Sequence, residues 1–321
     1  MTSYEIGPCP ACGSNSAATV ANADDMRDEL EQLWAFHTRR LRPDTPPDML
    51  RDRVTFSQKP PLAIVRCEHC SLLFRNPRER ADRLVELYST EDPDDVALLT
   101  LLRNQRPSYA AQARRLTRVF GRTGRGLEVG CYVGAFLDAA RDHGWNFAGV
   151  DVNDNANAFA RRAGHRIETT TIEDSSPAER YDVIAFWNCF EQLPDPVAAA
   201  RAAHQRLLPG GMIALRVPNG DFYAAWRHRL HSSLRLLART FLAHNNLLAF
   251  PYRHGFTPHS LQLLLRHTGF RIDHLHGDTL VPIADPWTRR WAAAEERISK
   301  RILAAAPPAH SPWLELYARA L

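Results

Sequence analysis

Four of the six cysteines form two Cys-x-x-Cys pairs, Cys9 with Cys12 and Cys67 with Cys70. Two such pairs can supply four thiolates in tetrahedral geometry, the usual ligand set of a structural zinc ion. The stretch between the pairs is longer than in a compact zinc ribbon, which an inserted helix explains. The sequence therefore predicts a closed structural zinc site, with a degenerate site or a redox pair as alternatives.

A second chemical signal is the segment Leu127-Glu-Val-Gly-Cys-Tyr-Val-Gly134. A dinucleotide-binding loop has the pattern G-x-G-x-x-G. Counted from Gly130, those positions hold Gly130, Tyr132 and Ala135, so a nicotinamide cofactor is disfavoured. Asp151 follows about twenty residues later at the end of a predicted strand, where a carboxylate can accept hydrogen bonds from ribose hydroxyls.

The elements around these residues alternate between strand and helix. This order predicts an α/β fold with a mostly parallel sheet and helices on both faces. Predicted strands cover residues 126–129, 147–150, 166–171, 181–186, 212–217, 270–275 and 313–318. Predicted helices cover residues 135–143, 155–163, 196–207, 258–267 and 287–304.

The domain organisation follows from these patterns. Residues 1–79 are expected to form the zinc-binding module, with a helix over 24–42 inserted between the cysteine pairs. The spacing of apolar residues over 80–120 predicts a helical connector, and residues 121–321 are expected to form the main domain. Within it, residues 221–257 form a candidate substrate lid that is helical, basic and aromatic. This lid could bind an anionic substrate, lie on a membrane surface or simply pack on the domain.

The glycine segment resembles motif I of the class I S-adenosylmethionine-dependent methyltransferases, written E/D-x-G-x-G-x-G. Glu128, Gly130 and Gly134 match it, and Tyr132 replaces the middle glycine. Three later segments are similar to the same family. They are residues 181–196, 208–219 and 254–270. The resemblance implies a Rossmann-like seven-stranded sheet and S-adenosylmethionine as cofactor.

The resemblance also implies which residues hold the cofactor. In the family an acidic residue after the third strand receives the adenine amino group, and Glu173 and Asp174 both occupy that place. The predicted cofactor-binding residues are Glu128, Gly130, Tyr132, Gly134, Asp151, Val152, Glu173, Asp174 and Asn188.

Methyl transfer needs a base only when the nucleophile carries a proton. His254 is the preferred candidate, because its loop should border the substrate. Glu191 stands where many relatives have Glu-His, although Gln192 replaces the histidine here, and Tyr223 in the lid is a further candidate. Residues 188–191 lack the (D/N)-P-P-(Y/F) pattern of DNA amine methyltransferases, so DNA is not expected as a substrate.

The predicted function is methyl transfer from S-adenosylmethionine to a small molecule, a sugar or secondary-metabolite intermediate. Several sugar methyltransferases carry a similar cysteine module. One alternative is an RNA methyltransferase whose zinc ribbon holds RNA. It is disfavoured, because residues 1–30 carry one arginine against five acidic residues. Another is an inactive cofactor-binding subunit.

Composition adds two expectations. The net charge of +4 does not call for a nucleic-acid partner. The sequence has no run of eighteen apolar residues and no leader-like N-terminus, so neither a membrane span nor secretion is expected. The cysteines fit a reducing compartment, and the cytoplasm is the expected location.

Overall fold

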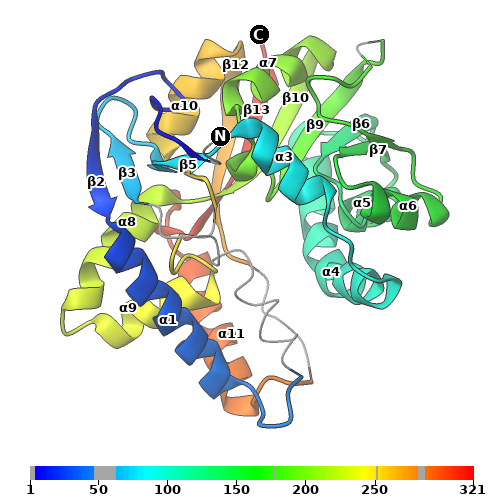
Figure 1. The fold of residues 1–321 in the computed structure, drawn as a ribbon. Coiled ribbons are helices and arrows are strands. Elements are labelled where there is room, and N and C mark those ends of the chain that lie inside the picture. Colours follow the sequence, from blue (N-terminus) through cyan, green and yellow to red (C-terminus); the bar gives the residue numbers. More distant parts are fainter. Residues whose placement is uncertain (1–3, 47–62, 177, 251, 281–285) are drawn as a thin grey trace.

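A seven-stranded sheet forms the centre of the computed structural model, which describes residues 4–46, 63–176, 178–250, 252–280 and 286–321 (Figure 1). The strand order is β12-β13-β10-β9-β6-β7-β8. β13 is antiparallel to both neighbours, and the strands from β10 to β8 are parallel. The strands are β6 (Arg125–Val129), β7 (Asn146–Asp151), β8 (Ile167–Thr169), β9 (Tyr181–Trp187), β10 (Leu207–Pro218), β12 (Phe270–Asp278) and β13 (Trp313–Ala320). The predicted seven-stranded, mostly parallel sheet is confirmed.

Helices cover both faces of this sheet, as predicted. Alternate side chains of a strand point to opposite faces. Along β9, Val183 and Ala185 belong to the core that contains α4, α5 and α6, whereas Ile184 and Phe186 belong to the core with α7 and α10. The helices are α4 (Asp95–Phe120), α5 (Ala135–Asp142), α6 (Asp154–Arg162), α7 (Pro196–Arg206) and α10 (Pro258–His267).

Local sequence fixes where several of these helices begin. Asp195 caps α7 by accepting hydrogen bonds from two backbone N–H groups, and Pro196 occupies the first helical position. Thr257 and Ser260 form a capping box at α10. The segment that follows β9 and the segment before α10 contact each other and the neighbouring strand β10.

The cysteines belong to a smaller antiparallel sheet of four strands, in the order β11-β4-β3-β2. Three strands come from the N-terminal part, namely β2 (Ala17–Ala21), β3 (Ile64–Cys67) and β4 (Leu73–Arg75). The fourth, β11 (His254–Gly255), comes from the segment before α10 and pairs with β4. No local sequence pattern predicts this pairing. A short pair, β1 (Tyr4–Glu5) with β5 (Arg78–Glu79), lies beside it.

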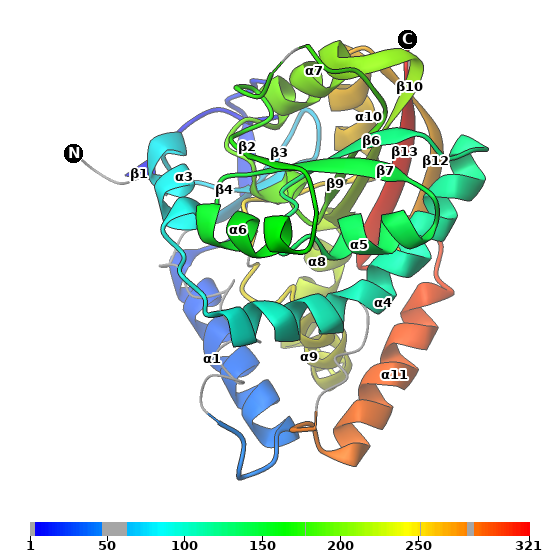
Figure 2. The ribbon, with the colours of Figure 1, turned by 90° about the vertical axis from the view of Figure 1, so that its right-hand side faces the viewer.

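A helical layer lies next to the small sheet and away from the large one (Figures 1 and 2). Its core is formed by apolar side chains of α1, α8, α9 and α11. The helices are α1 (Ala23–Arg40), α8 (Gly220–His228), α9 (Arg235–His244) and α11 (Arg290–Ala304), and α3 (Ala81–Ser89) leads from the small sheet to α4. Among the described residues, no helix is long and apolar enough to cross a membrane.

The basic residues of the predicted lid turn partly inward. Arg227 forms ion pairs with Asp25 and Glu29 of α1, at 3.0 and 2.9 Å. Arg239 donates to Gln32 at 2.9 Å. These two arginines therefore fix the lid helices to α1 and are not available to a substrate.

Candidate functional site

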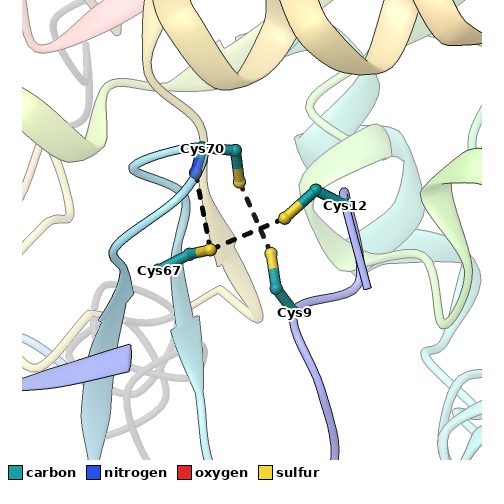
Figure 3. A group of neighbouring side chains, drawn as sticks. All are labelled: Cys9, Cys12, Cys67 and Cys70. Atoms are coloured by element: carbon teal, nitrogen blue, oxygen red, sulfur yellow. Dashed lines mark hydrogen bonds between the residues drawn. The ribbon is translucent and has the colours of Figure 1, made fainter. Parts of the chain in front are cut away.

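The four cysteines of the two pairs lie together, as Figure 3 shows. The Sγ atoms of Cys9 and Cys70 are 3.5 Å apart, and those of Cys12 and Cys67 are 3.6 Å apart. All four sulfur atoms lie within 4.8 Å of one another. A tetrahedral zinc ion with Zn–S bonds of about 2.3 Å requires sulfur atoms about 3.8 Å apart. The donor set and spacing therefore fit a structural zinc ion.

Two tight turns bring these thiols together. The N–H of Gly13 donates to the Cys9 carbonyl at 2.8 Å, which closes the first turn. In the second, the N–H of Cys70 donates to the Cys67 sulfur at 3.5 Å. Three of the thiols are buried and Cys12 is half-buried, so the cluster offers no open position for a substrate.

The glycine loop connects β6 to α5. Gly130 has a left-handed φ of 73°. A Cβ atom there would also lie 2.5 Å from the Cys189 sulfur, so only glycine fits. Tyr132 is left-handed as well, with a φ of 43°. The loop thus keeps the backbone conformation that glycine favours, although tyrosine replaces the glycine of the motif.

Asp151 is held at the end of β7 by this loop. Its carboxylate accepts hydrogen bonds from the backbone N–H groups of Tyr132 at 3.0 Å and Asn153 at 2.8 Å. Burial raises its pKa, and the backbone hydrogen bonds oppose that rise. One bond to each oxygen fixes the carboxylate and leaves further lone pairs for ligand hydroxyls. Val152 follows it in the turn before α6.

Glu128 is a buried carboxylate on β6 with an unused acceptor. Its Oε2 atom has no hydrogen-bond partner among the described residues. Burial, and then the negative charge of Asp151, raise its pKa well above the ordinary value. Such a group is costly without a partner, so a ligand with a cationic or donor group would stabilise it.

Glu173 and Asp174 lie in the turn after β8, and both are exposed. The Asp174 carboxylate accepts from the Thr171 hydroxyl at 2.9 Å, and the Asp174 N–H donates to the same hydroxyl at 3.3 Å. Asp174 therefore takes part in the turn itself. A role for either residue in binding adenine stays a prediction.

Glu191 lies beyond the end of β9, in the short helix η2 (Phe190–Gln192). It is fully buried, and neither carboxylate oxygen has a hydrogen-bond partner in the described part of the chain. Burial raises its pKa to about 8. Asn188 just before it is left-handed, with a φ of 56°, and its carbonyl accepts from Gln192 at 2.7 Å.

Three tyrosines outside the recognised motifs lie around Glu191. The Tyr88 hydroxyl donates to Gln192 at 2.7 Å. Burial raises the pKa of Tyr88, Tyr109 and Tyr252, and the negative charge of Glu191 adds to each rise. Sequence reasoning missed the first two, because the connector helices carrying them show only an apolar periodicity.

His254 lies on β11, next to η2. Its ring is fully buried, and neither nitrogen has a hydrogen-bond partner among the residues described. Burial, and then the positive charges of Arg253 and Arg78, hold its pKa well below the ordinary range. The imidazole is therefore neutral at neutral pH and able to accept a proton.

The third catalytic candidate, Tyr223, lies in a different environment. Its hydroxyl donates to Glu29 of α1 at 3.0 Å, and the same carboxylate oxygen accepts the Ala249 N–H at 3.0 Å. Arg227 pairs with the other oxygen. Tyr223 therefore joins α8 to α1, whereas Glu191 and His254 lie on two neighbouring elements, η2 and β11. Its catalytic role stays a prediction.

Comparison with known proteins points to one family. A family model described as "Methyltransferase domain" matches residues 101–275. The ubiquinone biosynthesis O-methyltransferase of Pseudomonas aeruginosa (strain UCBPP-PA14) is 30% identical over 101 residues, covering 29% of this chain and 44% of the relative. The protein of that name from Marinobacter nauticus is 26% identical over 172 residues, covering 50% and 68%. The chain thus spans less than half the length of the first of these relatives.

The chain is also similar to two solved structures. The plantazolicin methyltransferase BpumL in complex with SAH has a TM-score of 0.48 and 18% identity, covering 74% of this chain and 93% of that one. A possible histamine N-methyltransferase from Thermotoga maritima has a TM-score of 0.46 and 15% identity, covering 68% and 91%.

The cysteine cluster predicts one zinc ion per chain, measured by elemental analysis of the purified protein. Cys9→Ser removes a thiolate from a closed site, so zinc should be lost and the melting temperature should fall by roughly 5–10 °C. His69→Ala is the matched control, because His69 is exposed in the same turn as Cys67 and Cys70. A zinc-free wild-type protein would contradict the prediction.

The raised pKa of Glu191 predicts a pH-dependent stability. The folded protein keeps the proton up to about pH 8, whereas the unfolded chain releases it near 4.5. The free energy of unfolding therefore falls as pH rises between these values, by about 1.4 kcal/mol per pH unit from this group. Glu191→Gln should remove that part of the slope in urea denaturation.

The exposed Glu168 provides the control for this measurement. Glu168→Gln should leave the slope of unfolding free energy against pH as it is in the wild type. Equal slopes for the wild type and Glu191→Gln would show that Glu191 is not protonated in the folded state.

Proposed function

This chain belongs to the methyltransferase-domain family, and we propose that it transfers the methyl group of S-adenosylmethionine to a small-molecule acceptor. The observation that carries the proposal is the fixed carboxylate of Asp151, held by the backbone of the loop that begins at Gly130. Loop and carboxylate lie together at the carboxyl edge of the parallel strands, where ligands bind in open α/β sheets.

The residues at this edge fit the cofactor. Asp151 offers acceptors to the two ribose hydroxyls. The unpartnered carboxylate of Glu128 suits the ammonium group of the methionine portion. Gly130 allows the backbone to approach the ligand closely. When bound, S-adenosylmethionine supplies an electrophilic methyl group on a sulfonium sulfur.

The acceptor side is assigned to Glu191 and His254. His254 is assigned as the proton acceptor, because its imidazole is neutral at neutral pH and both ring nitrogens lack a hydrogen-bond partner among the described residues. Glu191 has a pKa of about 8 and is mostly protonated at pH 7, so it suits a hydrogen-bond donor to the acceptor molecule. The buried tyrosines Tyr88, Tyr109 and Tyr252 would exclude water from this site.

A small acceptor is favoured over RNA by the burial of these groups. Glu191 and His254 are fully buried, so an acceptor must enter the fold to reach them, which a small molecule does more readily than an RNA chain. The relatives named as O-methyltransferases support a hydroxyl acceptor. A sugar or secondary-metabolite intermediate carrying a hydroxyl meets both requirements. The zinc ion assigned to the cysteine cluster holds the small sheet together and takes no part in the reaction.

Asp151→Asn tests cofactor binding. The amide keeps the size of the side chain but loses the charge and one acceptor, so the affinity for S-adenosylmethionine should fall at least about tenfold in calorimetry. Asp154→Asn is the control, because Asp154 is an acid of the same turn that begins α6. Equal affinities for the wild type and Asp151→Asn would count against this cofactor site.

Transfer itself is tested with S-adenosylmethionine labelled on the methyl group. Label should enter a hydroxyl-bearing metabolite fraction and not total RNA. His254→Gln should slow transfer by about 10²–10⁴-fold without changing cofactor affinity, since it removes only the base. His259→Gln, an exposed position five residues later, is the control. Labelling of RNA alone would favour the nucleic-acid alternative, and cofactor binding without transfer to either fraction would favour the inactive subunit.

A further inference from the structure

Two buried arginines lie side by side where the small sheet gains its fourth strand. The backbone N–H of Arg75 donates to the Arg253 carbonyl at 3.1 Å, which makes them neighbours across β4 and the start of β11. Each side chain is only 5% exposed. Like charges on neighbouring strands repel, and the interior offers them little screening.

One carboxylate serves both guanidinium groups. Glu79 lies 3.8 Å from Arg75 and 3.3 Å from Arg253, and it is as buried as they are. Arg75 also donates to the Phe250 carbonyl at 2.8 Å, and Arg253 to the Glu79 carbonyl at 2.9 Å. Carbonyl groups carry no net charge, so the cluster keeps one positive charge in excess.

Both arginines also have an unused donor. The Nε atoms of Arg75 and Arg253 have no hydrogen-bond partner among the described residues. Arg78 nearby does not share this property, because its Nε pairs with Glu5 at 3.1 Å. Burial lowers the pKa of Arg75 and Arg253, which is the expected response of cations that lack enough negative charge around them.

This excess charge lies next to the acceptor side of the proposed site. His254 follows Arg253 directly on β11, and β11 lies next to η2, which carries Glu191. The charges of both arginines act on Tyr88, whose hydroxyl donates to Gln192. An anion bound by the arginine pair would therefore be close to the groups assigned to the acceptor.

We propose that Arg75 and Arg253 bind an anionic group of the acceptor, a carboxylate or a phosphate. The inference rests on the proposed function and narrows its substrate class. A guanidinium group presents parallel N–H donors that match the oxygen pairs of both anions. The bound anion would balance the excess charge and use the free Nε donors, and it would orient the rest of the acceptor toward His254.

The test uses the melting temperature of the whole 321-residue chain without S-adenosylmethionine. Inorganic phosphate and acetate are titrated separately at constant ionic strength, kept constant with potassium chloride. Saturable stabilisation of about 5 °C is expected with at least one of them. Phosphate alone would indicate a phosphorylated acceptor, and acetate alone a carboxylate. No saturable response to either anion would overturn the proposal.

The variant Arg253→Met distinguishes an arginine pair that binds an anion from one that only stabilises the fold. It leaves Arg75 paired one to one with Glu79, so in potassium chloride without phosphate or acetate the melting temperature should stay the same or rise. The anion response should disappear. Arg66→Met is the control, because Arg66 is on the neighbouring strand β3 and pairs with Asp221. An anion response in Arg253→Met equal to that of the wild type would overturn the proposal.

Arg253→Lys covers the case in which the methionine variant does not fold. It keeps the charge but lacks the planar pair of donors, so anion affinity should fall at least about fivefold. Unchanged affinity would contradict the assignment. Calorimetry with S-adenosylmethionine on the same variants should give wild-type affinity, so failure of the anion site is distinguishable from failure of the cofactor site.

Discussion

The close approach of β11 to the end of β10 is the contact on which the acceptor side depends. The Gly220 N–H donates to the Phe256 carbonyl at 2.7 Å, and a Cβ atom at Gly220 would lie 2.4 Å from the Gly255 carbonyl oxygen. Only glycine permits this separation. From this position β11 pairs with β4, so one short strand joins the small sheet to the large sheet.

This contact explains why the small sheet is part of the site, although its cysteine thiols take no part in the proposed reaction. The cysteine cluster fixes the turns next to β3 and β4, and β4 in turn fixes β11 with His254. The buried core around Cys67 and Cys70 also includes Phe186 of β9. A structural zinc ion would therefore help to fix the position of β11 and of His254, the residue proposed to accept the proton.

The site buries more polar and charged side chains without full hydrogen bonding than folding alone favours. Within the part of the chain that the structure describes, Glu128, Glu191 and His254 are buried with hydrogen-bonding atoms that have no partner, and the Arg75–Arg253 pair shares one carboxylate. Burying such groups costs stability unless a ligand completes them. Glu128 lies near the carboxyl end of β6, Glu191 follows β9 and His254 is on β11, an arrangement consistent with a cofactor at Glu128 and an acceptor at the other groups.

By itself, the sequence determined what depends on neighbouring residues. The alternation of strands and helices, the glycine loop with Glu128 and Asp151, and the two cysteine turns all come from short-range patterns, because periodicity and turn geometry are local. Only the tertiary structure decided that β11 pairs with β4, that Tyr88 lies beside Glu191, and that Tyr223 bonds to Glu29. Those contacts join residues far apart in the chain, and they depend on packing that no local pattern contains.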